Sequence, residues 1–194
     1  QLTFVEDWYW ATGEIPELAW DPVPAPDADV PVLVLPSGPA DREETASLLM
    51  QHALHTARER AWISSPYFVP DSAVQAALKL AALRGVDVRI LIPKQGDARI
   101  MDLAGLAFFQ GLLAAGVRIF RYREGMLHHK TVVVDDQASA IGTVNLDNRS
   151  LRLNFEVTAL FFGETTAREV ASHFQVDLEA SEEVTTDMVT GLPL

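Results

Sequence analysis

Two histidines and a lysine stand directly before an apolar run in LHHKTVVVDD, residues 127–136. The residue types allow chemistry, because an imidazole can attack as a nucleophile or move a proton near neutral pH. Alternate residues of a strand share one face, so His128 and Lys130 are predicted to lie together. His129 points to the opposite face and is not expected to join them.

Glu156 is a carboxylate in an otherwise apolar stretch, LNFEVTALFF, residues 153–162. Burying a carboxylate costs free energy unless it is paired. A histidine is a suitable partner, because a carboxylate that accepts from one ring nitrogen fixes the tautomer and leaves the other nitrogen free to attack. We infer that Glu156 orients His128. A salt bridge to Arg149 or Arg152 is the alternative.

From about Val32 to Tyr122 the sequence alternates strand and helix signals. Asp71 is placed to cap one of the helices and Gly85 to end it. This order predicts an α/β fold, a mixed β-sheet flanked by helices on both faces. Strands are expected at 30–38, 61–70, 86–93, 117–122, 127–135, 138–145 and 153–163, and helices at 43–60, 71–85 and 98–116.

Composition narrows the class of protein. The 194 residues suffice for about one domain with a proper core. A net charge of −12 argues against a broad nucleic-acid surface, although it leaves room for a local phosphate pocket. The absence of cysteine excludes disulfides, thiol catalysis and Cys-ligated zinc. No apolar run is long enough for a membrane span, so the chain itself is expected to be soluble.

Together these runs give the pattern H-x-K-x4-D-x6-G-T-x-N, with His128, Lys130, Asp135, Thr143 and Asn145 at defined positions. The pattern resembles the HKD motif of the phospholipase D superfamily at every defined position. The stretches EDWYWATGE, WISSPYFVPD, GVDVRILIP and NLDNRSLRLNFEV also resemble segments of bacterial cardiolipin synthases, and the resemblance covers residues 1–178.

The resemblance implies a role for each matched residue. His128 corresponds to the histidine that either attacks phosphorus or protonates the leaving alcohol, and which of the two it does stays open. Lys130 and Asn145 correspond to the residues that hold the phosphate oxygens. Thr143 replaces the commoner serine, keeps the hydroxyl and is also expected to bind substrate. Asp135 corresponds to an aspartate that mainly organises the motif, although it could simply cap its strand.

The resemblance also assigns Glu156 to the acidic partner of the motif histidine, in agreement with the burial argument. It implies no metal and no other cofactor. Two motifs form one active site in this superfamily, and only one is present here, because His52 and His55 lack the accompanying residues and are expected to be ordinary helix positions. The start at Gln1 suggests the C-terminal half of a longer protein. The partner is then the other motif-bearing half or a second copy.

Three regions are predicted: an aromatic segment with a Pro-rich linker at 1–31, a phospholipase D-like half-domain at 32–178 and a tail at 179–194. The tryptophans of the first region could reach a membrane interface, but packing against the missing half is favoured. Ser64 and Ser65 could line the pocket or simply end a strand.

The function implied is transfer of a phosphatidyl group between two phosphatidylglycerol molecules through a phosphohistidine, giving cardiolipin and glycerol. The substrate is thus an anionic phospholipid, no nucleic-acid partner is expected, and the parent protein is expected at the cytoplasmic membrane of a bacterium. The alternatives are a phospholipase or nuclease that uses water as acceptor, and an inert binding module.

Overall fold

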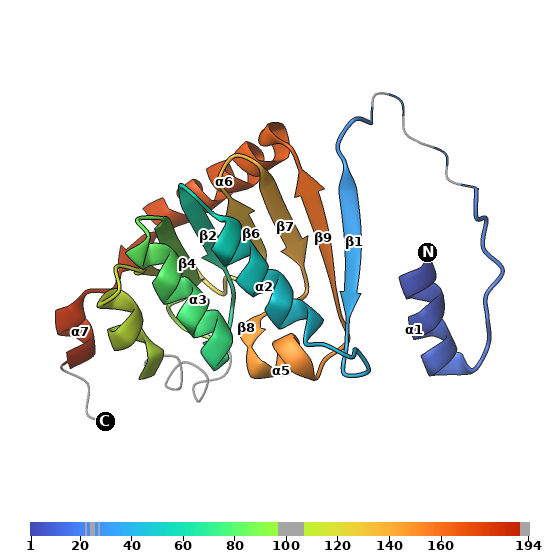
Figure 1. Cartoon of the computed structure of the whole chain (residues 1–194), viewed down its shortest axis with the longest axis horizontal. Coiled ribbons are helices and arrows are strands. Elements are labelled where there is room, and N and C mark those ends of the chain that lie inside the picture. The colour runs from blue at the N-terminus through green and yellow to red at the C-terminus, as the bar shows by residue number, and fades with distance from the viewer. Residues whose placement is uncertain (22, 24–25, 27, 97–106, 191–194) are drawn as a thin grey trace. The chain divides into compact units, whose positions relative to one another are not determined.

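A computed structural model describes residues 1–21, 23, 26, 28–96 and 107–190 (Figure 1). The chain divides into two compact units, Gln1–Val30 and Pro31–Leu194. The first unit contains helix α1 (Leu2–Thr12), which was not predicted from the sequence, and none of the residues of α1 is buried. The helix ends at Gly13, whose φ of 74° is left-handed and favours glycine.

The second unit is built on a mixed eight-stranded sheet in the order β1-β9-β7-β6-β2-β4-β5-β10. Strands β2, β4 and β5 run parallel to one another, and the remaining neighbours pair antiparallel. The strands are β1 (Val32–Ser37), β2 (Arg60–Ser64), β4 (Asp87–Pro93), β5 (Arg118–Tyr122), β6 (Thr131–Val134), β7 (Ala138–Gly142), β9 (Glu156–Phe162) and β10 (Ser181–Glu183). A separate parallel pair joins β3 (Phe68–Val69) to β8 (Leu146–Asp147).

Helices cover both faces of this sheet, as the sequence predicts (Figure 1). Helices α2 (Thr45–Thr56) and α3 (Ser72–Leu83) pack on one face and α6 (Glu164–Glu179) on the other. The remaining helices are α5 (Asn148–Arg152) and α7 (Thr186–Thr190), and residues 107–113 are also helical. The rest of the helix expected at 98–116 lies largely outside the described residues.

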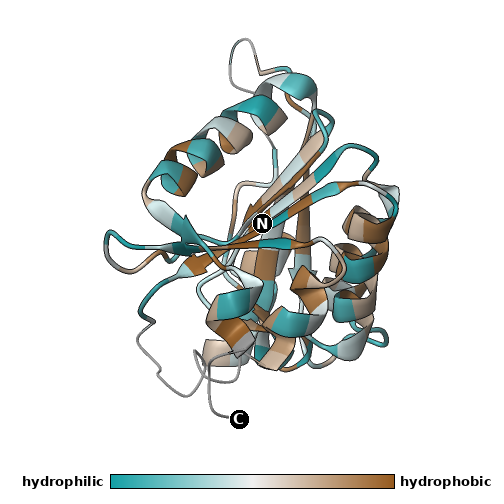
Figure 2. Cartoon of the chain, turned by 90° about the vertical axis from the view of Figure 1, so that its left-hand side faces the viewer, coloured by the Kyte–Doolittle hydropathy of each residue, from teal (hydrophilic) through white to brown (hydrophobic). Residues whose placement is uncertain are grey.

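Strand alternation divides the core into two layers. Ile63 and Ile90 belong to the layer under α2 and α3, whereas their neighbours Trp62 and Leu91 belong to the layer under α6. In the second layer the Trp62 and Phe174 rings stack with centroids 5.3 Å apart. The strands between the helices accordingly carry much of the hydrophobic colour in Figure 2. None of the described helices is long and apolar enough to cross a membrane.

Three stretches differ from the sequence-based expectation. The strand expected at 61–70 is interrupted after Ser64, and Pro66 lies in the break because it has no N–H to donate to a ladder. The strand expected at 127–135 begins only at Thr131. A short helix, α5, follows Asp147, whose carboxylate accepts hydrogen bonds from the N–H groups of Arg149 and Ser150.

The segment after residue 178, expected to be a tail, adds a strand to the sheet. Residues Ser181–Glu183 pair with β5. Two ion pairs accompany the strand: Lys94 Nζ lies 2.9 Å from Glu182, and Arg118 Nε lies 2.7 Å from Glu183. An acidic strand therefore lies beside basic side chains at the sheet edge. It was not predicted, because its sequence has no alternating apolar pattern.

Asp71 caps α3, as the sequence predicts, and also joins three helices. Its carboxylate accepts from Val74 N–H (2.8 Å) and from the Ser47 hydroxyl of α2 (2.7 Å), and it lies 3.5 Å from Arg152 of α5. Burial opposes ionisation of Asp71, but these hydrogen bonds and the Arg152 charge outweigh it and hold the pKa below 3.8.

The substitution Asp71→Ala is expected to lower the free energy of unfolding by about 1–3 kcal/mol, because it removes the cap and leaves buried donors unpaired. The control Glu44→Ala, which removes only the exposed partner of Arg152, should stay close to wild type. Since the folded pKa is depressed, the contribution of Asp71 is present above pH 3.8 and is lost as the pH falls through the folded value. Urea titrations between pH 3 and 7 measure this, and equal acid sensitivity in Asp71→Asn would contradict it.

Candidate functional site

The residues singled out by the sequence gather, with the exception of Asp135, at one end of the sheet. Lys130 immediately precedes β6, Thr143 and Asn145 follow β7, and Glu156 begins β9. The ladder sets their register: Gly142 N–H donates to Lys130 O (3.2 Å), and Gly142 lies opposite Thr158. Three strands therefore bring these side chains to a common edge of the fold.

Gly142 is required by a close approach of backbone. A Cβ added here would lie 2.5 Å from Val157 O and 2.8 Å from Thr158 Cα. Thr143 joins the end of β7 to β9 through its backbone and its side chain. Its N–H donates to Val157 O (3.0 Å), and its hydroxyl accepts from Val157 N–H (2.9 Å). The Gly-Thr pair thus fixes how closely β9 approaches the end of β7.

His128 and Lys130 lie side by side, as alternation predicts. Lys130 Nζ is 3.3 Å from His128 Nδ1 and donates to His128 O at 2.7 Å. Burial lowers the pKa of Lys130 below the usual 10.5, while the carboxylates of Glu156 and Asp147 oppose that shift. Lys130 is thus a cation beside a histidine, within electrostatic range of two carboxylates.

Glu156 is half-buried and accepts a hydrogen bond from Asn154 Nδ2 at 3.1 Å. In the described structure no hydrogen bond joins Glu156 to His128, so the pairing of these two residues stays a prediction. The alternative partner Arg152 is engaged elsewhere, with Glu44 at 3.1 Å and Asp71 at 3.5 Å.

Asn145 has an unused polar atom. Its Nδ2 donates to Ser150 Oγ at 3.2 Å, and its Oδ1 is buried with no hydrogen-bond partner in the described structure. Because a serine hydroxyl can either accept or donate, Ser150 can hold the amide in either orientation. In the flipped orientation Oδ1 faces Ser150, and the amide N–H donors take the place of the unpaired oxygen.

Asp135 lies at the other end of β6, five residues from Lys130 and so about 16 Å along the strand. Its carboxylate is 6% exposed and accepts hydrogen bonds from the N–H groups of Arg58, Glu59 and Arg60, at 2.8 to 3.2 Å. It adopts a left-handed φ of 51°. Its observed contacts organise the turn after β6 rather than the His128 end.

Ser64 ends β2 beside the site, Ser65 follows it, and each is 1% exposed. Ser65 Oγ donates to Tyr67 O (2.7 Å) and accepts from Leu146 N–H (2.9 Å), so it fixes the turn after β2. Ser64 Oγ has no partner in the described structure. Asp147 and Ser150 were not predicted from the sequence to belong to the site. An aspartate directly before a helix is nevertheless a typical N-cap signal.

A mostly apolar cavity of about 490 Å³ lies between α2 and the sheet and reaches the site. Leu49, Met50, Val132 and Leu160 line it, together with Lys130. Among the described residues no three His, Asp or Glu side chains lie close enough together to hold a metal ion.

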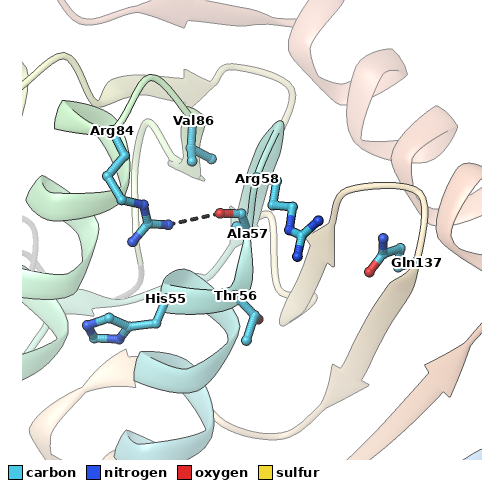
Figure 3. A pocket seen from close by; sticks show the side chains of 7 residues that line it. All are labelled: His55, Thr56, Ala57, Arg58, Arg84, Val86 and Gln137. Carbon is cyan, nitrogen blue, oxygen red and sulfur yellow. Dashed lines mark hydrogen bonds between the residues drawn. The ribbon is translucent and has the colours of Figure 1, made fainter.

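A second concavity, of about 780 Å³, lies near the end of the sheet that carries Asp135 (Figure 3). Arg84 contributes to its wall, but its guanidinium donates to Leu54 O (3.0 Å) near the end of α2 and to Ala57 O (2.9 Å) directly after it. Neither His128 nor Lys130 lines it, so it is separate from the candidate site. Its lining residues are His55, Thr56, Ala57, Arg58, Arg84, Val86 and Gln137.

Comparison with known proteins gives consistent results. The family described as "Cardiolipin synthase, PLD-like domain" matches residues 50–178. Cardiolipin synthase A of Pseudomonas putida KT2440 is 52% identical over 187 residues, which cover 96% of this chain and 39% of that protein. The chain therefore spans about two fifths of the length of this relative.

Solved structures show the same fold. A phospholipase D family member, Nuc from Salmonella typhimurium, aligns with a TM-score of 0.69 at 21% identity, covering 81% of this chain and 100% of that one. Phosphatidylserine synthase of Haemophilus influenzae aligns with a TM-score of 0.63 at 18% identity, covering 79% of this chain and 39% of that one.

The substitution Asp135→Ala is expected to destabilise the chain by about 2–4 kcal/mol, because three backbone donors lose their acceptor and alanine must adopt a left-handed φ. Asp135→Asn should lose less, since asparagine tolerates that conformation and retains an acceptor. Asp136→Ala is the matched control, because the carboxylate of Asp136 forms ion pairs on the surface. Chemical denaturation measures all three, and equal losses at 135 and 136 would refute the organising role.

Lys130 should titrate below pH 10.5, because burial disfavours its charged form. Inorganic phosphate should raise the pKa of Lys130, because an anion beside the amine favours the ammonium. NMR titration of isotope-labelled lysine side chains, with Lys130→Met to assign the signal, measures both effects. An unshifted Lys130 signal that does not respond to phosphate would show that Lys130 does not contact the anion.

Proposed function

The chain belongs to the family of cardiolipin synthase PLD-like domains, and we propose on that premise that it forms one half of the active site of a phosphatidyltransferase. The strongest support is the position of Lys130 beside His128, at the end of the sheet where Asn145 follows β7 and Glu156 begins β9. The proposed reaction moves a phosphatidyl group from one phosphatidylglycerol to another and yields cardiolipin and glycerol.

Two histidines, His128 and its counterpart in a second motif, divide the chemistry. One attacks the phosphorus of the first phosphatidylglycerol while the other protonates the departing glycerol oxygen, which leaves a phosphatidyl-histidine. The second histidine, now deprotonated, then takes the proton from a hydroxyl of the incoming phosphatidylglycerol. That oxygen attacks phosphorus, the phosphorus–nitrogen bond breaks, and the first histidine is regenerated.

Lys130 and Asn145 stabilise the charge that develops on the non-bridging oxygens. The ammonium of Lys130 lies beside His128, so it can meet an oxygen of a phosphate that His128 contacts. The buried amide of Asn145 supplies neutral donors once Ser150 holds it in its flipped orientation. Thr143 acts indirectly, by fixing β9 to the end of β7.

Glu156 is the proposed acidic partner for the motif histidine. Its carboxylate is held at the start of β9 by Asn154 and influences the charge of Lys130. A carboxylate in this position can accept a hydrogen bond from one ring N–H of His128 and leave the other ring nitrogen directed at phosphorus. His128 is exposed, so its side chain has room to reorient.

The second motif comes from another part of a longer protein or from a second copy of this chain. The match to only 39% of a cardiolipin synthase A supports the first arrangement. The catalytic half-domain, expected to cover residues 32–178, is proposed to include β10 as well, because β10 pairs with β5 at the sheet edge. Such an enzyme works on lipid at the cytoplasmic membrane.

A lipid phosphodiester fits this site better than a nucleic acid. The apolar cavity that reaches Lys130 can adjoin hydrocarbon, whereas a nucleic-acid backbone would require a row of cations. The net charge of −12 opposes a polyanion over the rest of the surface. A single lipid phosphate needs positive charge at one place only, and Lys130 contributes part of it.

The full-length protein is expected to convert phosphatidylglycerol to cardiolipin and glycerol, and His128→Ala should lower kcat by about 10²- to 10⁴-fold because it removes one acid–base or nucleophilic group. Thin-layer separation of labelled lipid measures the product. His55→Ala, in α2, is the control and should keep wild-type activity, because His55 lines the concavity that is separate from the site. Full activity in His128→Ala would overturn the assignment, and release of phosphatidic acid instead of cardiolipin would identify a hydrolase.

A further inference from the structure

The segment Leu127–Lys130 carries two proposed reacting groups but receives little support from the sheet. Strand β6 begins only at Thr131. Within the described residues, Gly142 N–H to Lys130 O is the backbone hydrogen bond that joins the segment to a neighbouring strand. The position of His128 therefore depends on side chains of the segment itself.

Two side chains of the segment attach it to α6. Leu127 is 4% exposed and packs in the core layer that contains Val170 and Phe174 of that helix. His129 Nε2 lies 3.4 Å from Asp177 Oδ2, near the end of α6. His129 and Asp177 also line a cavity of about 350 Å³ between β6, β7 and α6.

Leu127 and His129 alternate with His128 and Lys130 along the extended chain. The first pair faces α6, while Lys130 lines the apolar cavity on the opposite side of the sheet. Every residue that faces the proposed substrate is thus flanked by one attached to the helix. A displacement of His129 moves His128 and Lys130 with it, because all three belong to one short stretch of backbone.

We propose that His129 and Asp177 are positioning residues, which hold the motif segment on α6 so that His128 and Lys130 meet the phosphate correctly. This inference rests on the proposed phosphatidyl transfer. Burial lowers the pKa of His129, with Asp177 opposing the shift and Lys130 and His173 adding to it. A neutral His129 can still donate its Nε2–H to the Asp177 carboxylate.

The expected effects on reaction rate and on the free energy of unfolding distinguish this role from a purely structural one. The His129 and Asp177 side chains are 41% and 24% exposed, so their pairing adds little to the free energy of unfolding. In contrast, a misplacement of about 1 Å at reacting groups can cost 10²-fold in rate. The pair should therefore matter for catalysis much more than for stability.

The test uses the full-length enzyme in detergent–lipid micelles. His129→Ala and Asp177→Ala should each lower kcat by about 10- to 100-fold, with KM and the melting temperature nearly unchanged. His129→Gln should recover most of the rate, because its amide nitrogen can reach Asp177 from nearly the same place as Nε2. The double alanine variant should be no slower than either single variant, since both remove one contact.

His173→Ala is the matched control. His173 is also a histidine on α6 and lines the same cavity, but in the described structure it makes no hydrogen bond or ion pair with the motif segment. It should keep the wild-type kcat. Equal losses in His173→Ala and His129→Ala, a matching fall in melting temperature, or additive losses in the double variant would overturn the positioning role.

A second measurement separates this proposal from the proposed function. Histidine ring NMR of the 194-residue chain reports the environment of His128 directly. The His128 signals should shift or broaden in His129→Ala and Asp177→Ala, while those of His52 and His55 stay in place. If the wild-type enzyme transfers no phosphatidyl group but these shifts occur, only the proposed function fails. Unchanged His128 signals would overturn the anchoring itself.

Discussion

The close approach of β7 and β9 at Gly142 is the constraint on which the site depends. A Cβ at this position would meet Val157 O at 2.5 Å, so only glycine lets the two backbones come together. Thr143 then bonds Val157 through both its backbone and its hydroxyl, and Gly142 N–H holds Lys130 O. The ends of β6, β7 and β9 are thereby placed in a fixed relation, and polar side chains from three separate stretches of sequence share one edge.

Alternation along short extended segments determines which side chains face each side of the sheet. In the sheet it separates the layer under α2 and α3 from the layer under α6, which leaves both faces of the central strands buried. In the segment Leu127–Lys130, alternation places the side chains that attach to α6 on one side and the side chains proposed to react on the other. A polar residue on the α6 side, His129, is tolerated because Asp177 pairs with it in a partly exposed position, where desolvation costs are moderate.

The sequence predicted the features that follow from local periodicity. The sheet with helices on both faces, the cap at Asp71 and the proximity of His128 to Lys130 were all accessible, because each depends on spacing within one element. The N-terminal helix α1, the late start of β6, α5 and β10 were not predicted. The residues of β10 form ion pairs with Lys94 and Arg118, which are distant in sequence. The pairing of His129 with Asp177 likewise joins residues far apart in the chain.

The charge around Lys130 supports the proposal that one motif is only part of a site. Lys130 is the cation that lies beside His128, and the carboxylates of Glu156 and Asp147 lie within its electrostatic range. A phosphodiester brought to this position adds a further negative charge, so one lysine cannot balance the local charge. A second lysine and histidine, contributed by the proposed partner motif, would restore the balance and supply the missing proton-transfer group. The acidic environment of Lys130 thus favours an active site assembled from two halves over one that works alone.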